Sequence, residues 1–179
     1  MTRAATPDRL AEIAPETLSE QQAAVLEKLL AGRGRIPTPY KVWLHSAELA
    51  QHLLSLGNFL SQRTTLSQRE TEIVVLTVAA HWKGDYVFAV HSREARAAGL
   101  TEEVIDAIGG NAPVSFTGAR ETALYALSRS LAEDQPPSDA VFEAAVRELG
   151  RAGLAEALAL FGYFTSVALA LKVHRVAAP

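Results

Sequence analysis

The chain has 179 residues, of which 49% are hydrophobic and 21% are charged, and its formal net charge is −3. This length is sufficient for one domain with a sizeable core, and the slightly acidic balance gives no electrostatic reason to expect nucleic acid or an anionic membrane as a partner. The chain contains no cysteine, which excludes disulfides, thiolate metal sites and thiol redox chemistry by its own side chains.

The N-terminal region predicts an arm followed by one amphipathic helix. Residues 1–18 contain Pro7 and Pro15, which interrupt helices. Ser19 begins a capping-box motif, SEQQ, and apolar residues follow it at helical spacing. We expect this helix to end at Gly32. The start of the chain also lacks the apolar segment of a signal peptide, and we therefore expect a cytoplasmic protein.

The central region predicts three helices. Apolar residues recur at roughly helical spacing over residues 40–60, which favours one long helix there. Ser67 begins a second capping box, SQRE, and starts a strongly apolar helix. A break at Lys83–Gly84 separates that helix from the next one, which begins close to Tyr86.

The remaining chain predicts four more helices. They cover residues 101–109, 119–132, 138–149 and 154–173, with a glycine-rich stop after the first and a bend at 150–153 between the last two. The longest uncharged run, inside the last helix, is shorter than the roughly 20 residues of a membrane-spanning helix, so we expect it to be buried within or between subunits.

No segment predicts a strand, and the short loops favour an all-α bundle of seven to eight helices. We divide the chain into an N-terminal arm with the first helix, residues 1–36, and a single helical domain, residues 37–179. We expect no membrane and no nucleic acid as partners.

Glu72 and His91 are the leading candidates for a functional pair. If the helices on either side of the break pack antiparallel, Glu72 lies about three turns before it and His91 about two turns after it, at comparable depth. A carboxylate that orients an imidazole suits proton transfer. The alternative is a structural pair that bridges two buried helices.

Other polar residues near the break are weaker candidates. The Tyr86 hydroxyl could bind a substrate carboxylate or donate a proton, or the ring could simply pack at a helix start. His81 and Trp82 could line a pocket entrance, and His45 could form part of a pocket wall. Each has a structural alternative: a polar helix end with an anchoring indole for the first two, and a packing role for the third. We expect Asp85 to cap the second helix.

Motifs for cofactors are missing from the sequence. No H-x-x-x-H or E-x-x-H pair occurs together with a second matching element, so we expect no metal. The sequence also lacks a P-loop, a G-x-G-x-x-G motif and a G-x-S-x-G motif, and we expect no other cofactor.

The runs LSQRETEIVVL, GDYVFAVH and AAGLTEE resemble the carboxymuconolactone decarboxylase and alkylhydroperoxidase-D-like superfamily over residues 41–130. Its peroxidase branch carries C-x-x-C-x-x-x-H with a Glu one helix earlier. Here the His matches His91 and the Glu matches Glu72, whereas the two cysteines fall on Gly84 and Val87. The resemblance therefore points to the cysteine-free branch, and a cysteine-dependent peroxidase is not expected.

The resemblance implies a helical fold that assembles as a trimer or hexamer, and an activity like that of γ-carboxymuconolactone decarboxylase. In this hypothesis His91 transfers a proton to a small lactone or carbonyl carboxylic acid, Glu72 orients His91, and Tyr86 donates a hydrogen bond. Arg69 and Arg120 are the candidates for binding the substrate carboxylate. The alternative is a non-catalytic oligomer that binds a small acid or a protein partner.

Overall fold

The computed structural model describes residues 9–133 and 136–179, so the first eight residues of the expected arm lie outside it. The described residues form no strand, and the all-α prediction is confirmed. A 3-10 turn and eight α-helices follow one another in this order: η1 (Pro15–Thr17), α1 (Glu20–Arg33), α2 (Thr38–Trp43), α3 (Ala47–Gln62), α4 (Gln68–Trp82), α5 (Asp85–Ala97), α6 (Glu102–Gly109), α7 (Ala119–Ala132) and α8 (Asp139–Val173).

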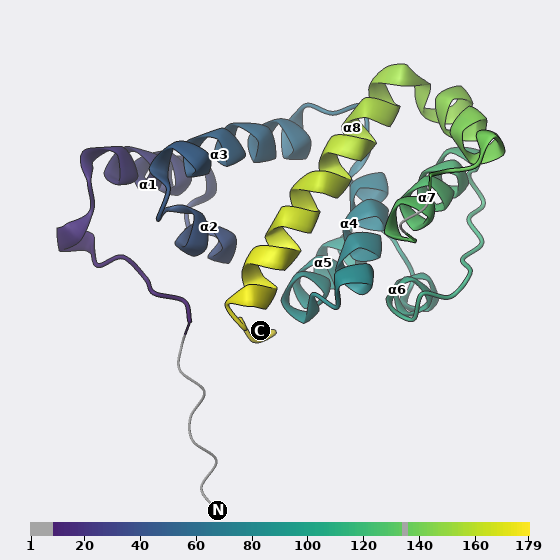
Figure 1. Ribbon diagram of the computed structural model, residues 1–179. Helices are drawn as coiled ribbons and strands as arrows, with labels where there is room; N and C mark the ends of the chain where they lie inside the picture. Colours follow the sequence, from purple (N-terminus) through teal and green to yellow (C-terminus); the bar gives the residue numbers. More distant parts are fainter. Residues whose placement is uncertain (1–8, 134–135) are drawn as a thin grey trace, which may run out of the picture.

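Helix α4 is the centre of the fold and packs against α5, α6, α7 and α8 (Figure 1). Its residues from Ile73 to Ala79 are all buried, as expected for a helix that is apolar on every side. The predicted capping box is present, because the Ser67 and Glu70 side chains each bond the other's backbone N–H. The predicted break is also confirmed: Lys83 adopts the left-handed conformation, with φ 51°.

Helix α8 crosses the molecule between α2 and α3 on one side and α4 and α5 on the other (Figure 1). It bends at Gly150, whose φ of 70° and ψ of 172° lie outside the helical region, so the bend predicted at 150–153 is confirmed. By length and composition this one helix could cross a membrane, although a third of its most apolar stretch is buried in the fold. Its outer face leaves Leu158, Leu169 and Val173 exposed, and assembly through that face stays a prediction.

The first helix belongs to the same core as the rest of the chain. Val25 and Leu29 of α1 are buried in one apolar cluster with residues of α3, α4, α7 and α8. A second cluster, centred on Ile73 and Ile105, joins α4 to α5, α6 and α7. Both clusters include side chains of α4, which explains why that helix has no solvent-facing stripe.

The prediction of one helix over residues 40–60 is wrong. The chain forms α2 and α3 there, separated by an extended residue, Ser46, with φ −124° and ψ 91°. Two local signals account for the difference. Pro39 starts a separate short helix, because proline is favoured in a first helical turn. Ser46 occupies the position before α3, where serine competes with helical backbone.

Two predicted helix ends shift by a residue or two. Helix α1 continues past Gly32 to Arg33. Gly34, with φ 64°, follows as its C-terminal cap in the left-handed conformation. Gly84, rather than Asp85, occupies the cap position of α5, and Asp85 is the first helical residue. There its negative charge still faces the positive end of the helix.

Candidate active site

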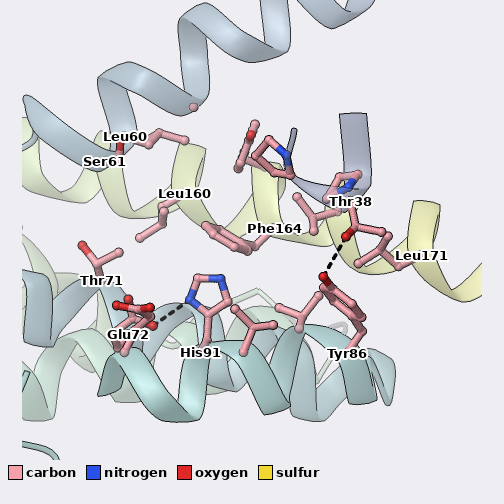
Figure 2. Close-up of a pocket in the computed structure, with 18 of the residues that line it drawn as sticks. Thr38, Leu60, Ser61, Thr71, Glu72, Tyr86, His91, Leu160, Phe164 and Leu171 are labelled. Atoms are coloured by element: carbon pink, nitrogen blue, oxygen red, sulfur yellow. Dashed lines mark hydrogen bonds and ion pairs between the residues drawn. The ribbon is translucent and has the colours of Figure 1, made fainter. Parts of the chain in front are cut away.

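A cavity of about 400 Å³ lies between α8 and the helices α2, α3, α4 and α5 (Figure 2). One part of its wall is apolar and includes Leu60, Leu160, Phe164, Val167 and Leu171. The polar part includes Arg35, Thr38, Ser61, Gln68, Thr71, Glu72, Tyr86, His91 and Glu94. A mostly apolar wall with a few polar groups is typical of sites for small organic ligands.

Glu72 and His91 meet in the wall of this cavity. His91 Nδ1 lies 2.8 Å from Glu72 Oε2. The two side chains therefore meet, as expected for antiparallel packing of α4 and α5. Only 2% of the Glu72 side chain is exposed, compared with 21% of His91. An ionised carboxylate can only accept hydrogen bonds, so Nδ1 carries the proton in this pair.

The second oxygen of Glu72 is also engaged. Gln68 Nε2 donates to Glu72 Oε1 over 2.6 Å. A buried carboxylate therefore has a partner on each oxygen, as burial requires. Sequence reasoning missed Gln68, although its spacing of four residues from Glu72 on one helix is a signal that could have identified it.

The His91 ring is fixed by packing as well as by its carboxylate. The Phe164 ring meets it edge to face, with ring centres 4.9 Å apart and an angle of 86°. Figure 2 shows the remaining ring nitrogen, Nε2, turned away from Glu72 toward Phe164 and Leu160. The imidazole therefore presents one nitrogen to the carboxylate and the other to the cavity.

Tyr86 lies at the opposite end of the cavity from Glu72 (Figure 2). Its hydroxyl shares a hydrogen bond of 2.7 Å with Thr38 Oγ1, which joins α5 to α2. Thr38 was not predicted from the sequence, because it is 48 residues away and only the tertiary fold brings it to Tyr86. The predicted site residues Glu72, His91 and Tyr86 thus line one cavity.

The other three candidates do not line it. His45 is exposed, and its Nε2 lies 2.7 Å from the carbonyl oxygen of Ala11. His81 is exposed and packs edge to face on Trp82, with ring centres 4.9 Å apart. Trp82 packs its indole against the core near the end of α4. The structure therefore separates them from the Glu72–His91 pair.

Arg69 and Arg120 are engaged in ion pairs outside the cavity. Arg69 Nε lies 2.6 Å from Glu121 Oε1. Arg120 Nε lies 2.5 Å from Glu70 Oε1, and the same guanidinium donates to the carbonyl oxygen of Glu148. Both arginines join α4 to α7, and neither lines the cavity, so the expectation that they bind substrate is not supported by their positions.

Gly84 and Val87, the two positions that match the missing cysteines, lie in apolar surroundings. Val87 is 2% exposed and lines the cavity. Gly84 is buried, and a Cβ added there would lie 3.5 Å from Ala168 Cβ. No group of three His, Asp or Glu side chains in the described part of the chain is arranged to hold a metal ion.

The model of the Carboxymuconolactone decarboxylase family matches residues 47–129. The chain therefore resembles this family over 83 of its 179 residues. The matched segment runs from α3 to α7 and contains Glu72, Tyr86 and His91, whereas Thr38 and the α8 wall of the cavity lie outside it. No curated protein matches the chain in sequence.

Solved structures share the fold of this protein at low sequence identity. A peroxidase-related protein from Silicibacter sp. TM1040 is 18% identical, with a TM-score of 0.71 over 100% of this chain and 95% of that one. A protein of unknown function from Agrobacterium tumefaciens, with a suggested role as the antioxidant defence protein AhpD, is 18% identical, with a TM-score of 0.66 over 76% of this chain and 94% of that one.

A third similar structure is a variant of the debrominase Bmp8 in complex with 2,3,4-tribromopyrrole. It is 11% identical, with a TM-score of 0.74 over 95% of this chain and 91% of that one. These likenesses establish an AhpD-like fold for this protein.

Proposed function

We propose that this protein is an enzyme that decarboxylates a small lactone or carbonyl carboxylic acid by proton transfer, without thiol redox chemistry. The observation that carries the proposal is the Glu72–His91 pair, joined over 2.8 Å in the wall of a cavity of about 400 Å³. The match of residues 47–129 to the carboxymuconolactone decarboxylase family supports the reaction class. The absence of cysteine argues against a mechanism that needs a thiolate.

The reaction needs a proton donor at carbon. When the bond between the ring carbon and the carboxyl carbon breaks, CO₂ leaves and its electron pair remains as an enolate or dienolate. An acid must then protonate the carbanionic carbon. Nε2 of a doubly protonated His91 would supply that proton, while Nδ1–H stays bonded to Glu72.

The reaction also needs hydrogen-bond donors at oxygen. The negative charge of a dienolate is shared with the carbonyl oxygen of the lactone, and a fixed donor lowers the energy of that charge in a water-poor site. Tyr86 and Thr38 bring two hydroxyl groups to the end of the cavity opposite Glu72. In this proposal, Tyr86 donates to the lactone oxygen while His91 acts at carbon.

The proposal is tested by measuring CO₂ release from γ-carboxymuconolactone by the wild type and by His91→Ala and His91→Gln. General acid–base catalysis is worth about 10²–10⁴-fold, so both variants should lose about this much of kcat while keeping the helical circular-dichroism spectrum. His52→Ala is the matched control, because His52 is exposed on α3 and lies outside the cavity.

Two outcomes would contradict the proposal. Full activity of His91→Ala would exclude His91 as the proton donor. No CO₂ release from folded wild-type protein would exclude γ-carboxymuconolactone as the substrate. That second result would favour another lactone or carbonyl acid, or a protein that binds a small acid without catalysis.

A further inference from the structure

Arg35 is the only Lys or Arg among the residues that line the cavity, all of which belong to the described chain. The cavity's carboxylates are Glu72, which is bound to His91 and Gln68, and Glu94, which is exposed. A cavity proposed for a carboxylic acid therefore contains one permanently cationic side chain, Arg35.

The backbone around Arg35 fixes where this cation enters. Gly34 ends α1 in the left-handed conformation, and Pro37 and Pro39 flank the start of α2. Prolines restrict φ, so the loop has little freedom between these points. Arg35 approaches from the side of α2, three residues before Thr38, whereas His91 and Glu72 belong to the facing wall built by α5 and α4.

Arg35 differs from the two arginines first expected to bind a carboxylate. Arg69 and Arg120 are both committed to carboxylates and to backbone carbonyls of the fold. Arg35 makes no hydrogen bond or ion pair with any other described residue. Its guanidinium is exposed and available for an anion that enters the cavity.

We propose that Arg35 binds a carboxylate that stays on the substrate when another one leaves as CO₂. Arg35 would thereby select acids over neutral lactones. This inference rests on the proposed decarboxylation. An ion pair with the carboxylate that leaves as CO₂ would stabilise the ground state more than the transition state, because that charge moves away from the carboxyl group during the reaction. An ion pair with a retained carboxylate acts equally in both states and lowers KM.

The guanidinium suits this role because it can donate two parallel hydrogen bonds to one carboxylate. With the acid held near α2, the face of the lactone ring would lie against Leu160 and Phe164, which form the wall beside His91 (Figure 2). The predicted ligand is thus a compact ring with a carboxylate on one side and its reacting carbon toward His91 Nε2.

The test measures binding without turnover. The probe is 5-oxotetrahydrofuran-2-acetate, a saturated γ-lactone with a single carboxylate and no group that can leave as CO₂, together with its methyl ester. Calorimetric titrations would compare the wild type with Arg35→Gln and Arg35→Lys. Arg93→Gln is the matched control, because Arg93 is also an exposed arginine, lies two residues after His91 on α5, and does not line the cavity.

We expect the wild type to prefer the acid over the ester. Arg35→Gln should weaken acid binding about tenfold, the size of one charged hydrogen-bonded contact, with no change for the ester. Arg35→Lys should restore part of the loss, and Arg93→Gln should match the wild type. With γ-carboxymuconolactone, Arg35→Gln should raise KM while kcat stays near the wild-type value.

The proposal is overturned if Arg35→Gln binds the acid as well as the wild type does, if it loses acid and ester equally, or if the wild type shows no preference for the acid. These outcomes are separate from failure of the proposed reaction. Acid binding that depends on Arg35 in a protein that releases no CO₂ would sustain the binding role and reject the decarboxylation.

Discussion

Thr38 Oγ1 and Tyr86 Oη lie 2.7 Å apart and join α2 to α5 across one end of the cavity. The hydroxyl proposed to contact substrate is therefore already engaged in the free protein. Two roles follow for Tyr86, one in holding two helices together and one in donating to the lactone oxygen. The two roles can be separated because Thr38 takes part directly in only the first.

The first prediction separates these roles with Tyr86→Phe and Thr38→Val. Each variant removes the same hydrogen bond, so each should lower the free energy of unfolding by about 1 kcal/mol. Only Tyr86→Phe removes the proposed donor, and we expect its kcat to fall by about tenfold or more, while Thr38→Val keeps most of its turnover. Urea denaturation and CO₂ release check the two effects. Equal turnover in the two variants would restrict Tyr86 to a structural role.

The second prediction concerns how Glu72 acts through His91. Glu72→Gln keeps the shape of the side chain but removes the charge that faces the imidazole, so kcat should fall by about tenfold or more with little change in KM. Gln68→Leu leaves the charge in place and removes only the donor to Oε1, 2.6 Å away, so its effect on kcat should be smaller.

Steady-state kinetics at one pH, together with thermal unfolding, would test this order of effects. Ser61→Ala is a suitable control, because Ser61 lines the cavity and, among the described residues, its hydroxyl donates only to the Asn58 carbonyl of its own helix. A Glu72→Gln variant with wild-type kcat would show that the pair is structural.

The third prediction uses two glycines of α8 with no neighbouring atom within 4 Å of an added Cβ. Gly150 has φ 70° and ψ 172°, a region that only glycine occupies readily, so Gly150→Ala should destabilise the protein by about 1–3 kcal/mol. Gly162 is helical, and Gly162→Ala should stabilise it by roughly 0.5–1 kcal/mol. Urea denaturation midpoints measure both, and shifts of the same sign would contradict the assigned backbone conformations.

Local signals allowed much of the fold to be predicted from the sequence. The capping boxes at Ser19 and Ser67 and the break at Lys83–Gly84 depend on residues within about four positions, and all three are present. The error over residues 40–60 also concerns local signals, because Pro39 and Ser46 mark the separate starts of α2 and α3. Leucine spacing continues across Ser46, so a periodic pattern alone could not reveal a change of helix direction.

The sequence allowed prediction only of the site residues that lie on two consecutive helices facing each other. Glu72 and His91 belong to α4 and α5, and the position of the break set their depth. Arg35 and Phe164 reach the cavity from distant parts of the chain, through packing of α8 against both α2 and α5. No short-range pattern marks a loop arginine or a phenylalanine of an apolar helix as part of a site.

The last prediction concerns stability at high pH and rests on Tyr125. Burial raises the pKa of its hydroxyl above the usual value near 10, although Arg129 opposes the shift. The hydroxyl also donates to the carbonyl oxygen of Ala112 over 2.9 Å. As pH rises past about 10, the unfolded chain loses this proton before the folded protein does.

Stability must therefore fall with rising pH in that range, because the unfolded state then binds fewer protons. Below about pH 10 the contribution is fully present. Tyr125→Phe cannot ionise and keeps the ring contact with Phe116, so its unfolding free energy should decline less steeply than that of the wild type above pH 10. Below pH 9 the two curves should be separated by a constant difference, the cost of the hydrogen bond to Ala112. Curves that stay parallel up to pH 11 would mean that Tyr125 ionises equally easily in both states.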